Sequence, residues 1–397
     1  MSGEMSDEFD DRCPRPPRAP APVTLPHVTP IYLSSVYECR DPAQADALLG
    51  GREQGYVYTR DGHPNGDQLA AHAADLHGAQ RAVVTGSGMG ALAAAALALL
   101  QHGDHVVVSN QLYGRSQFLF TGELARLGVS ATIVDACNLT AVDSACQVRT
   151  RLIVVETISN PLLRVADIAG LADVARRHAA ALLVDNTFAG PGVCRPLALG
   201  ADLVMESLTK TMNGHSDVLL GLLCGREKLW QRVPVVISTY GLSAPPFECY
   251  LALRGLGTLA LRIDRAASNA LAAAEFLAGR SEVEAVIYPG LATHPDHALA
   301  RRQFGDRFGS MVSFTLRGGR AGTDRFVAGA KRIPFCPSLG ELATTLSHPE
   351  TTSHRALPPE VRAALGISGG MIRLSIGIES PQFVADALAE GLAACGG

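Results

Sequence analysis

The chain has 397 residues, 47% of them hydrophobic, which is enough apolar material for more than one core, so we expect two domains. A net charge of −4 without a basic stripe, together with 5% aromatic residues, argues against a nucleic-acid or membrane surface. Nine cysteines without CxxC or Cys/His spacing favour reduced thiols in a cytoplasmic protein and give no indication of a metal site. The longest uncharged apolar run, Ala91–Leu100, is too short to cross a bilayer. Small-molecule chemistry is therefore the favoured class of function.

The first residues of the chain are charged and then rich in proline. This composition cannot bury enough surface to order itself, so residues 1 to about 22 are predicted to form a flexible segment. We expect the whole N-terminal arm to extend to about residue 60.

Short β-branched segments alternate with Ala- and Leu-rich helical stretches between about Gln68 and Gly225. The predicted strands are Arg81–Thr85, His105–Ser109, Ala131–Val134, Leu152–Glu156, Ala181–Asp185, Leu203–Ser207 and Leu219–Cys224. Strands separated by helices predict βαβ units and a mostly parallel sheet with both faces covered. Ligands of such sheets lie at the carboxyl ends of the strands. We therefore expect an α/β large domain over about residues 61–255.

A second, smaller domain of α+β type is predicted for residues 256–397. Pro245 and Pro246 open a long helical pattern that continues to Leu277 and bridges into it. Within the smaller domain the pattern predicts strands at Gly309–Leu316 and Met371–Ile376, and a helix at Pro381–Ala394.

The glycine-rich segment Gly86–Gly90 (GSGMG) follows one predicted strand and directly precedes the helical stretch Ala91–Leu100. Backbone N–H groups at a helix start, left open by glycine and helped by a serine hydroxyl, form an anion site that suits a phosphate. A simple tight turn between strand and helix explains the same segment equally well. The spacing of a dinucleotide-binding GxGxxG motif is absent.

Asp185 ends a strongly apolar predicted strand, where a carboxylate is costly to bury unless it meets a cation. One suitable cation is the protonated ring nitrogen of pyridoxal 5'-phosphate (PLP), which an aspartate keeps charged. The alternative is an ordinary helix N-cap.

Lys210 follows another apolar strand in the segment Ser207–Lys210 (SLTK). A lysine is rarely placed near a sheet core, but forming an imine with an aldehyde removes the cost of burying its charge. The two neighbouring hydroxyls suit a phosphate. A lysine that extends to solvent is the alternative.

Each of these three features is ambiguous alone. They occur in chain order at three strand ends of one predicted sheet, where a phosphate loop, a pyridinium partner and an imine-forming lysine have to meet. The combination predicts a PLP-dependent enzyme acting on an amino acid.

The same segments resemble the fold-type I PLP enzymes of the Cys/Met metabolism (trans-sulfuration) family, over nearly everything from Pro30 to Ala394. The matching segments are Tyr58–Arg60, Gly86–Met89, Val107–Ser109, Tyr113–Gly114, Glu156–Pro161, Val184–Ala189, Ser207–Lys210, Gly214–Val218, Leu253–Leu256, Ser338–Gly340 and Arg373–Glu379. The resemblance implies a homotetramer built from two active dimers, in which the arm of one subunit reaches the site of its neighbour.

The resemblance also implies roles for individual residues around the cofactor. The phosphate contacts it implies are Gly88, Met89, Ser207 and Thr209, with Tyr58 and Arg60 from the neighbouring subunit. Tyr113 would stack on the ring, Asp185 would pair with the ring nitrogen and Asn160 would bond the ring hydroxyl. Arg373, with Ser338 and Asn160, would bind the substrate carboxylate through charged hydrogen bonds of roughly 1.5–3 kcal/mol each.

The implied mechanism begins when the substrate amine displaces Lys210, which then removes the Cα proton. Tyr113 is the expected acid or base at the leaving group. We expect α,γ-elimination from a methionine, homocysteine or cystathionine type of substrate, releasing a 2-oxo acid and ammonia. The alternatives are γ-replacement on an O-acylhomoserine, as in cystathionine γ-synthase or a sulfhydrylase, then a cystathionine β-lyase or an aminotransferase, and, from another class, a PLP-binding protein without turnover.

Three residues depart from the commoner family pattern. Pro337 stands where members that act on cystathionine often carry a glutamate, which weakens a strict cystathionine specificity. Arg115 replaces a small residue or cysteine and either brings positive charge toward the substrate or faces solvent. Glu206 stands where the family often has histidine, a change that the sequence alone does not explain.

Overall fold

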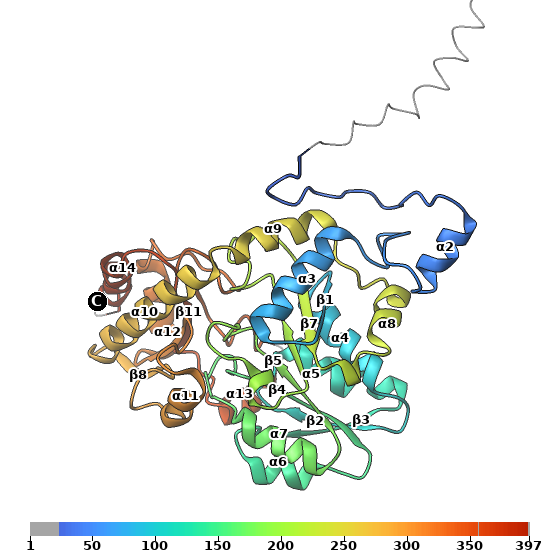
Figure 1. Cartoon of the computed structure of the whole chain (residues 1–397). Coiled ribbons are helices and arrows are strands. Elements are labelled where there is room, and N and C mark those ends of the chain that lie inside the picture. Colours follow the sequence, from blue (N-terminus) through green and yellow to red (C-terminus); the bar gives the residue numbers. More distant parts are fainter. Residues whose placement is uncertain (1–23, 356, 396–397) are drawn as a thin grey trace, which may run out of the picture. The chain divides into compact units, whose positions relative to one another are not determined.

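The structure is a computed structural model that describes residues 24–355 and 357–395 (Figure 1). The flexible segment predicted for residues 1 to about 22 lies outside the described residues. The described residues before Tyr32 form a unit separate from the rest of the chain. The domain boundaries expected near residues 60 and 255 remain predictions.

A seven-stranded mixed sheet forms the larger part of the structure from Tyr32 onward, with the strand order β1-β7-β6-β5-β4-β2-β3. Its strands are β1 (Arg81–Thr85), β2 (His105–Ser109), β3 (Ser130–Val134), β4 (Thr150–Glu156), β5 (Ala181–Asp185), β6 (Leu203–Glu206) and β7 (Gly221–Gly225). Strands β2 to β6 pair in parallel, whereas β7 is antiparallel to both β1 and β6. The mostly parallel α/β sheet is therefore confirmed.

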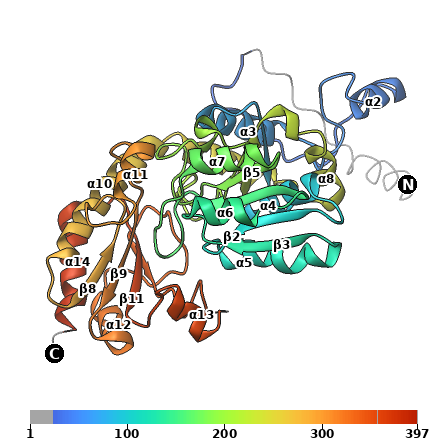
Figure 2. The ribbon, with the colours of Figure 1, turned by 90° about the horizontal axis from the view of Figure 1, so that it is seen from below.

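Side chains alternate between two apolar layers, one on each face of this sheet, as the two-residue period of a strand requires. On β2, Val107 joins one layer while Val106 and Val108 join the other. Helices α3 (Pro64–His77) and α7 (Ile168–Arg177) pack on the first face, and α4 (Gly88–Leu99) and α8 (Val233–Tyr240) belong to the second. Both faces are thus covered, as Figures 1 and 2 show.

A second sheet of four antiparallel strands, in the order β10-β11-β9-β8, follows in the C-terminal part (Figure 2). Its strands are β8 (Val283–Ile287), β9 (Met311–Leu316), β10 (Thr345–Ser347) and β11 (Met371–Ser375). Helices α10 (Leu259–Ala278), α12 (Gly319–Gly329) and α14 (Pro381–Ala393) pack against it and against one another. This sheet and its helices agree with the expected α+β part, although β8 and β10 were not predicted.

The long helix expected from Pro245 to Leu277 is two helices, α9 (Pro246–Leu256) and α10, separated by Gly257 and Thr258. Arg262 on α10 spans the break: its guanidinium donates at 2.9 Å to the carbonyl oxygen of Gly255, an acceptor at the end of α9 that also receives the N–H of Thr258 at 3.2 Å. The same side chain donates to the carbonyl oxygens of Thr211 and Met212 at 2.6 and 2.9 Å. The Arg262 side chain therefore anchors the loop that follows Lys210 to the start of α10.

Shorter helices complete the described part of the chain. They are α2 (Pro42–Leu49), α5 (Gly114–Phe118), α6 (Leu139–Ala145), α11 (His297–Phe304) and α13 (Pro359–Ala364). Among the described residues, no helix combines the length and apolarity needed to span a bilayer, and no three His, Cys, Asp or Glu side chains gather as metal ligands would.

Candidate active site

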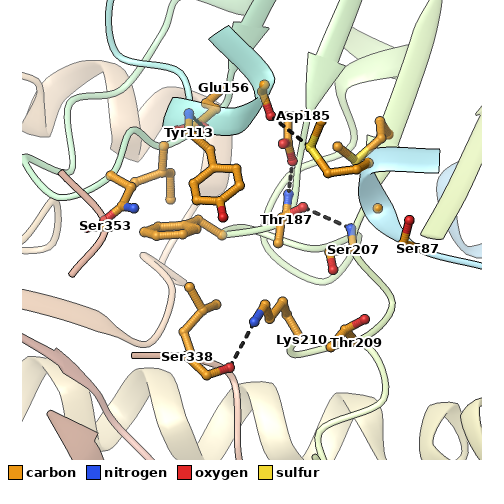
Figure 3. A pocket seen from close by; sticks show the side chains of 18 of the residues that line it. Ser87, Tyr113, Glu156, Asp185, Thr187, Ser207, Thr209, Lys210, Ser338 and Ser353 are labelled. Carbon is orange, nitrogen blue, oxygen red and sulfur yellow. Dashed lines mark hydrogen bonds between the residues drawn. The ribbon is translucent and has the colours of Figure 1, made fainter. Parts of the chain in front are cut away.

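A cavity of about 280 Å³ lies at the carboxyl ends of the parallel strands, where the sequence places the site (Figure 3). The large seven-stranded sheet and the C-terminal four-stranded sheet both contribute to the lining of this cavity, the latter through the loop before β10 and through strand β11. The lining residues are Ser87, Gly88, Met89, Tyr113, Ser116, Glu156, Ile158, Asn160, Asp185, Thr187, Phe188, Met205, Ser207, Thr209, Lys210, Leu219, Pro337, Ser338, Leu339, Ser353 and Arg373.

The glycine-rich segment forms one end of the cavity. Ser87 caps helix α4, because its hydroxyl accepts the N–H of Gly90 at 3.0 Å. A Cβ atom added at Gly88 would lie 3.0 Å from the Cβ of Ser207, so a larger residue would require Ser207 to shift by a few tenths of an ångström, and glycine allows the close approach of α4 to the segment after β6. Backbone N–H groups and the Ser207 hydroxyl are thereby brought together.

Asp185 ends β5 and is only 8% exposed. Burial raises the pKa of its carboxyl to about 6, although hydrogen bonds from Thr187 oppose the shift. One of these is the Thr187 N–H, which donates to Oδ1 at 3.0 Å, while the Thr187 hydroxyl accepts the N–H of Ser207 at 2.9 Å. Thr187 therefore links the aspartate to the serine at the other strand end.

Lys210 approaches the cavity from the side opposite Asp185 in Figure 3 and donates from Nζ to the hydroxyl of Ser338 at 2.8 Å. Burial lowers the pKa of the amine, with a smaller lowering effect from Arg373 that Glu341 opposes. Within the described part of the chain, no carboxylate lies within 4.0 Å of this amine. The expectation that Lys210 lies in a site rather than in solvent is consistent with this placement.

Arg373 on β11 is 4% exposed and makes two hydrogen bonds to neutral groups. It donates to Oδ1 of Asn160 at 2.8 Å and to the carbonyl oxygen of Ser338 at 2.9 Å, whereas Nε is buried with no partner among the described atoms. Burial lowers the pKa of the guanidinium to about 10, against an opposing effect of Glu341. A buried cation held by neutral acceptors is suited to receive an anionic ligand.

Tyr113 precedes α5 and remains 43% exposed at the cavity. Its backbone N–H donates to Oε1 of Glu156 at 2.7 Å, and Glu156 itself ends β4 next to Asp185 on β5. The ring is therefore anchored through its backbone, and its phenol end stays accessible.

Three predicted site residues do not line the cavity of this chain. Tyr58 and Arg60 are half-exposed, and the Arg60 guanidinium lies 5.0 Å from the Tyr58 ring centroid. Their predicted place is the site of a neighbouring subunit, so their position here is consistent with that expectation without testing it. Arg115 is exposed and lies outside the lining, which favours the solvent-facing alternative in the single chain.

Sequence analysis assigned no role to several residues of the lining, among them Glu156, Thr187, Phe188 and Ser353. The first three lie inside the quoted segments Glu156–Pro161 and Val184–Ala189, so position in a matching motif was the available signal. Ser353 lies in the loop after β10 and carried no such signal, because only folding brings that loop to the cavity.

Glu206, whose presence the sequence did not explain, points away from the cavity into the opposite face of the sheet. It is 1% exposed; Oε1 accepts from the Asn186 amide at 2.8 Å and lies 3.2 Å from Nε2 of His77, the last residue of α3. The Asn186 oxygen in turn accepts from the Thr157 hydroxyl at 2.6 Å. The 3.2 Å contact between Glu206 and His77 meets the distance for an ion pair but not the geometry of a hydrogen bond. It places the end of α3 beside the hydrogen bonds that connect the ends of β4, β5 and β6.

A mixed sheet of this topology, with a lysine and an aspartate on opposite walls of a cavity at its strand ends, defines a PLP-dependent enzyme of fold type I. The comparisons with known proteins agree. Residues 17–393 match the family model described as Cys/Met metabolism PLP-dependent enzyme. The chain belongs to this family, and it is a PLP-dependent trans-sulfuration enzyme.

Its relatives carry out several reactions. The chain is 39% identical to an O-succinylhomoserine sulfhydrylase of Pseudomonas aeruginosa, over 93% of this chain and 91% of the relative. It is 37% identical to an L-methionine gamma-lyase of Porphyromonas gingivalis, over 92% of each. A solved cystathionine gamma synthase of Xanthomonas oryzae pv. oryzae in complex with cystathionine superposes with a TM-score of 0.88 at 40% identity, covering 93% of each chain.

The residues present fit the cofactor of this family. Lys210 offers a half-buried amine with a neutral partner, Asp185 offers a buried carboxyl without a cation, and Gly88 leaves room at a helix start beside Ser207. These are the groups that an aldehyde, a pyridinium and a phosphate require.

Proposed function

We propose that this enzyme catalyses α,γ-elimination on a sulfur amino acid of the methionine, homocysteine or cystathionine type, releasing a 2-oxo acid and ammonia. The observation that carries the proposal is the arrangement of Lys210, Asp185 and Arg373 around one cavity. Asp185 and Arg373 are buried and Lys210 is half-buried, and none of the three has a partner of opposite charge within 4.0 Å among the described residues. A cofactor and an amino-acid carboxylate would supply the missing charges.

PLP, when bound, provides an electron sink for charge that develops at the substrate Cα. Lys210 would hold its aldehyde and Asp185 its ring nitrogen, while the Tyr113 ring would stack on its face and Asn160 would bond its ring hydroxyl. The phosphate would be held by Gly88, Met89, Ser207 and Thr209. In this structure the Thr209 hydroxyl donates to the carbonyl oxygen of Leu220 at 3.2 Å and accepts the N–H of Leu220 at 3.0 Å. To bind the phosphate, it would turn its single proton from Leu220 toward the phosphate.

Arg373 would orient the substrate by binding its α-carboxylate, and Ser338 and Asn160 position the guanidinium for this role. Nε of Arg373 is the donor that lacks a partner among the described atoms. The amine of Lys210, when it is not attached to the cofactor, would take the Cα proton of the substrate at Nζ. Burial favours the neutral amine and so makes Nζ a competent base.

Tyr113 is the group we assign to the leaving side of the substrate. Its backbone is anchored to Glu156, and its partly exposed phenol faces the cavity. The phenol oxygen would donate a proton to the departing sulfur and recover it afterwards.

The charge of the lining bears on the substrate. Among the lining residues, the carboxyl groups are Glu156 and Asp185, both at the strand ends of the large sheet. The part of the lining near Pro337, Ser338 and Ser353 carries no carboxylate to receive a second ammonium group. This favours a methionine or homocysteine type of substrate over cystathionine.

A second candidate is γ-replacement on an O-acylhomoserine. It is favoured by the similarity to an O-succinylhomoserine sulfhydrylase and to a cystathionine gamma synthase, which at 39% and 40% identity are as similar to this chain as the methionine gamma-lyases. The two reactions use the same residues in the same roles. They differ in whether a thiol adds to the substrate after the leaving group has departed.

A product screen by mass spectrometry tests the proposal. The holoenzyme is incubated with methionine, homocysteine, cystathionine, cysteine and acylated homoserines, each with and without an added thiol. Elimination predicts 2-oxobutanoate from methionine or homocysteine without a thiol. Turnover that requires both an acylated homoserine and a thiol would favour the replacement reaction instead.

The Lys210→Ala variant supplies the control for the chemistry. Because Nζ is both the point of cofactor attachment and the assigned base, we expect no turnover and no pyridoxyl adduct after borohydride reduction, whereas the wild type retains the adduct on Lys210. Retained turnover of a free amino acid by this variant would overturn the mechanism.

A further inference from the structure

Glu156 is a second buried carboxyl at the wall where Asp185 stands, and the proposed reaction gives this carboxyl no proton to carry. It is the last residue of β4 and is paired in register with Asp185, the last residue of β5. Both line the cavity and both are 8% exposed. The site therefore places two carboxyl groups where a single pyridinium needs one negative charge.

The two oxygens of Glu156 have different surroundings. Oε1 accepts the backbone N–H of Tyr113 at 2.7 Å. Oε2 is buried and has no hydrogen-bond partner among the described atoms. No Lys, Arg or His of the described residues forms an ion pair with this carboxyl, so no cation in the described part of the chain balances a negative charge on it.

The ionisable groups around Glu156 favour its neutral form. Burial raises the pKa of its carboxyl well above the usual value, and Asp185 on the neighbouring strand raises it further, while the amide N–H groups of Tyr113 and Asn160 lower it. The remaining charged groups of the same cavity, Lys210 and Arg373, are engaged with Ser338 and Asn160.

We propose that Glu156 is a positioning residue that works as a neutral carboxylic acid, with its proton on Oε2. Oε1 holds the backbone of Tyr113 and so fixes the aromatic ring over the cofactor site. The protonated Oε2 leaves Asp185 as the single negative charge at this wall, so that the ring nitrogen of PLP meets one anion and keeps its proton. This inference goes beyond the proposed reaction, because it holds for elimination and replacement alike.

Infrared difference spectroscopy tests the charge state directly. The spectrum of the Glu156→Gln holoenzyme is subtracted from that of the wild type near pH 8, where an ordinary glutamate is ionised. We expect the subtraction to show the carbonyl stretch of one neutral carboxylic acid. Glu275→Gln is the matched control: Glu275 is exposed on α10, so its difference spectrum should show only loss of a carboxylate band. Loss of a carboxylate band in Glu156→Gln would overturn the proposal.

The visible absorption of the bound cofactor gives a second measure, independent of turnover. Glutamine is neutral and keeps an acceptor for the Tyr113 N–H, so Glu156→Gln should leave the visible spectrum from about pH 6 to about pH 9 unchanged. If Glu156 were ionised, its neutralisation beside Asp185 would move the pH dependence of the spectrum by roughly one unit or more, and the proposal would be wrong. Should this variant fold poorly, the wild-type infrared band of a neutral acid, measured over the same pH range, decides the question.

Neither measurement depends on which amino acid is the substrate. A holoenzyme that shows no turnover in the product screen but retains the neutral-acid band would refute the proposed reaction and leave the role of Glu156 intact. The opposite result would refute the role of Glu156 alone.

Discussion

Lys210, Asp185 and Arg373, three ionisable side chains of the cavity, form hydrogen bonds with neutral groups and no ion pairs among the described residues. Lys210 and Arg373 donate to neutral oxygens, and Asp185 accepts from Thr187. Each arrangement costs desolvation energy that a ligand can return, since burying a charge is favourable only when it is paired. Single substitutions here should therefore affect ligand binding more than folding.

Arg373→Met should weaken the substrate and leave the cofactor in place. Removing a charged hydrogen-bonding group worth roughly 1.5–3 kcal/mol is expected to lower kcat/KM about 10- to 150-fold. Steady-state kinetics measures this loss, and the visible absorbance of the bound cofactor should be unchanged. An unaltered kcat/KM would show that the substrate carboxylate binds elsewhere.

Asp185→Asn should change how the stability of the cofactor-free protein depends on pH. The folded-state pKa of Asp185, about 6, lies above its ordinary value of 3.8, so between these values the folded state binds more protons than the unfolded state. The free energy of unfolding that this group contributes is therefore lost as the pH rises from below 3.8 to above about 6, by about 3 kcal/mol in total. An asparagine side chain does not ionise, so the Asp185→Asn variant should not show this loss.

Urea unfolding of both cofactor-free proteins near pH 5 and pH 7.5 measures the effect. The wild type should lose stability relative to Asp185→Asn on going to the higher pH, and PLP should restore it because the ring nitrogen pairs with the carboxylate. A wild type that gains stability relative to the variant would contradict the assigned shift.

At the scale of elements, the alternation of side chains along the strands separates chemistry from support. Asp185 and Met205 face the cavity, whereas Asn186 and Glu206, each the next residue, face the other side of the sheet. There Glu206 meets His77, so the end of α3 is tied to the strand that leads to Ser207. The departure from the family pattern at Glu206 thus has a physical partner in the fold.

Exchanging Glu206 and His77 tests whether the two side chains stabilise the fold as a pair. Glu206→His alone places two histidines together in a dry interior, and His77→Glu alone places two acids together, so each should destabilise the protein by about 3–5 kcal/mol. The double variant His77→Glu/Glu206→His should recover a large part of that loss. Urea unfolding in a double-mutant cycle measures the coupling, and additive losses would show that the two side chains do not act as a pair.

The elements themselves follow closely from local patterns. All seven strands of the large sheet were predicted within two residues at each end, because each is a short apolar or β-branched run bounded by turn residues or a helix start. The join between α9 and α10 was missed because the apolar pattern continues through Gly257. The contacts of Arg262 with Thr211 and Met212, which hold this region, join residues far apart in the chain and leave no local pattern. The short strands β8 and β10 carried too little pattern of their own.

At the scale of the whole molecule, the site of one chain is incomplete if the family assignment of Tyr58 and Arg60 holds, because neither lines its cavity. Both would then act in the site of a neighbouring subunit, as expected for a homotetramer of two active dimers. Their exposure, with Tyr58 42% accessible, is compatible with such a contact.

Mixing two inactive variants tests this sharing. Lys210→Ala abolishes the site in its own chain, and Arg60→Ala would damage the site of the neighbour. If subunits re-associate at random, hybrid dimers contain one intact site each, and activity should return to about one quarter of the wild-type value. Activity assays before and after co-refolding measure this return. No recovery would mean that Arg60 serves its own chain.

The sequence by itself determined the α/β architecture, the PLP cofactor and the strand ends that carry Gly88, Asp185 and Lys210, because these depend on local periodicity and on motifs contiguous in the chain. Only the tertiary structure decided which distant residues share the cavity, such as Ser353 in the loop after β10, and which ionisable groups become neighbours, such as Glu206 with His77 and Glu156 with Asp185. Charge balance is set by burial and by neighbours far apart in sequence, and neither is encoded in a local pattern.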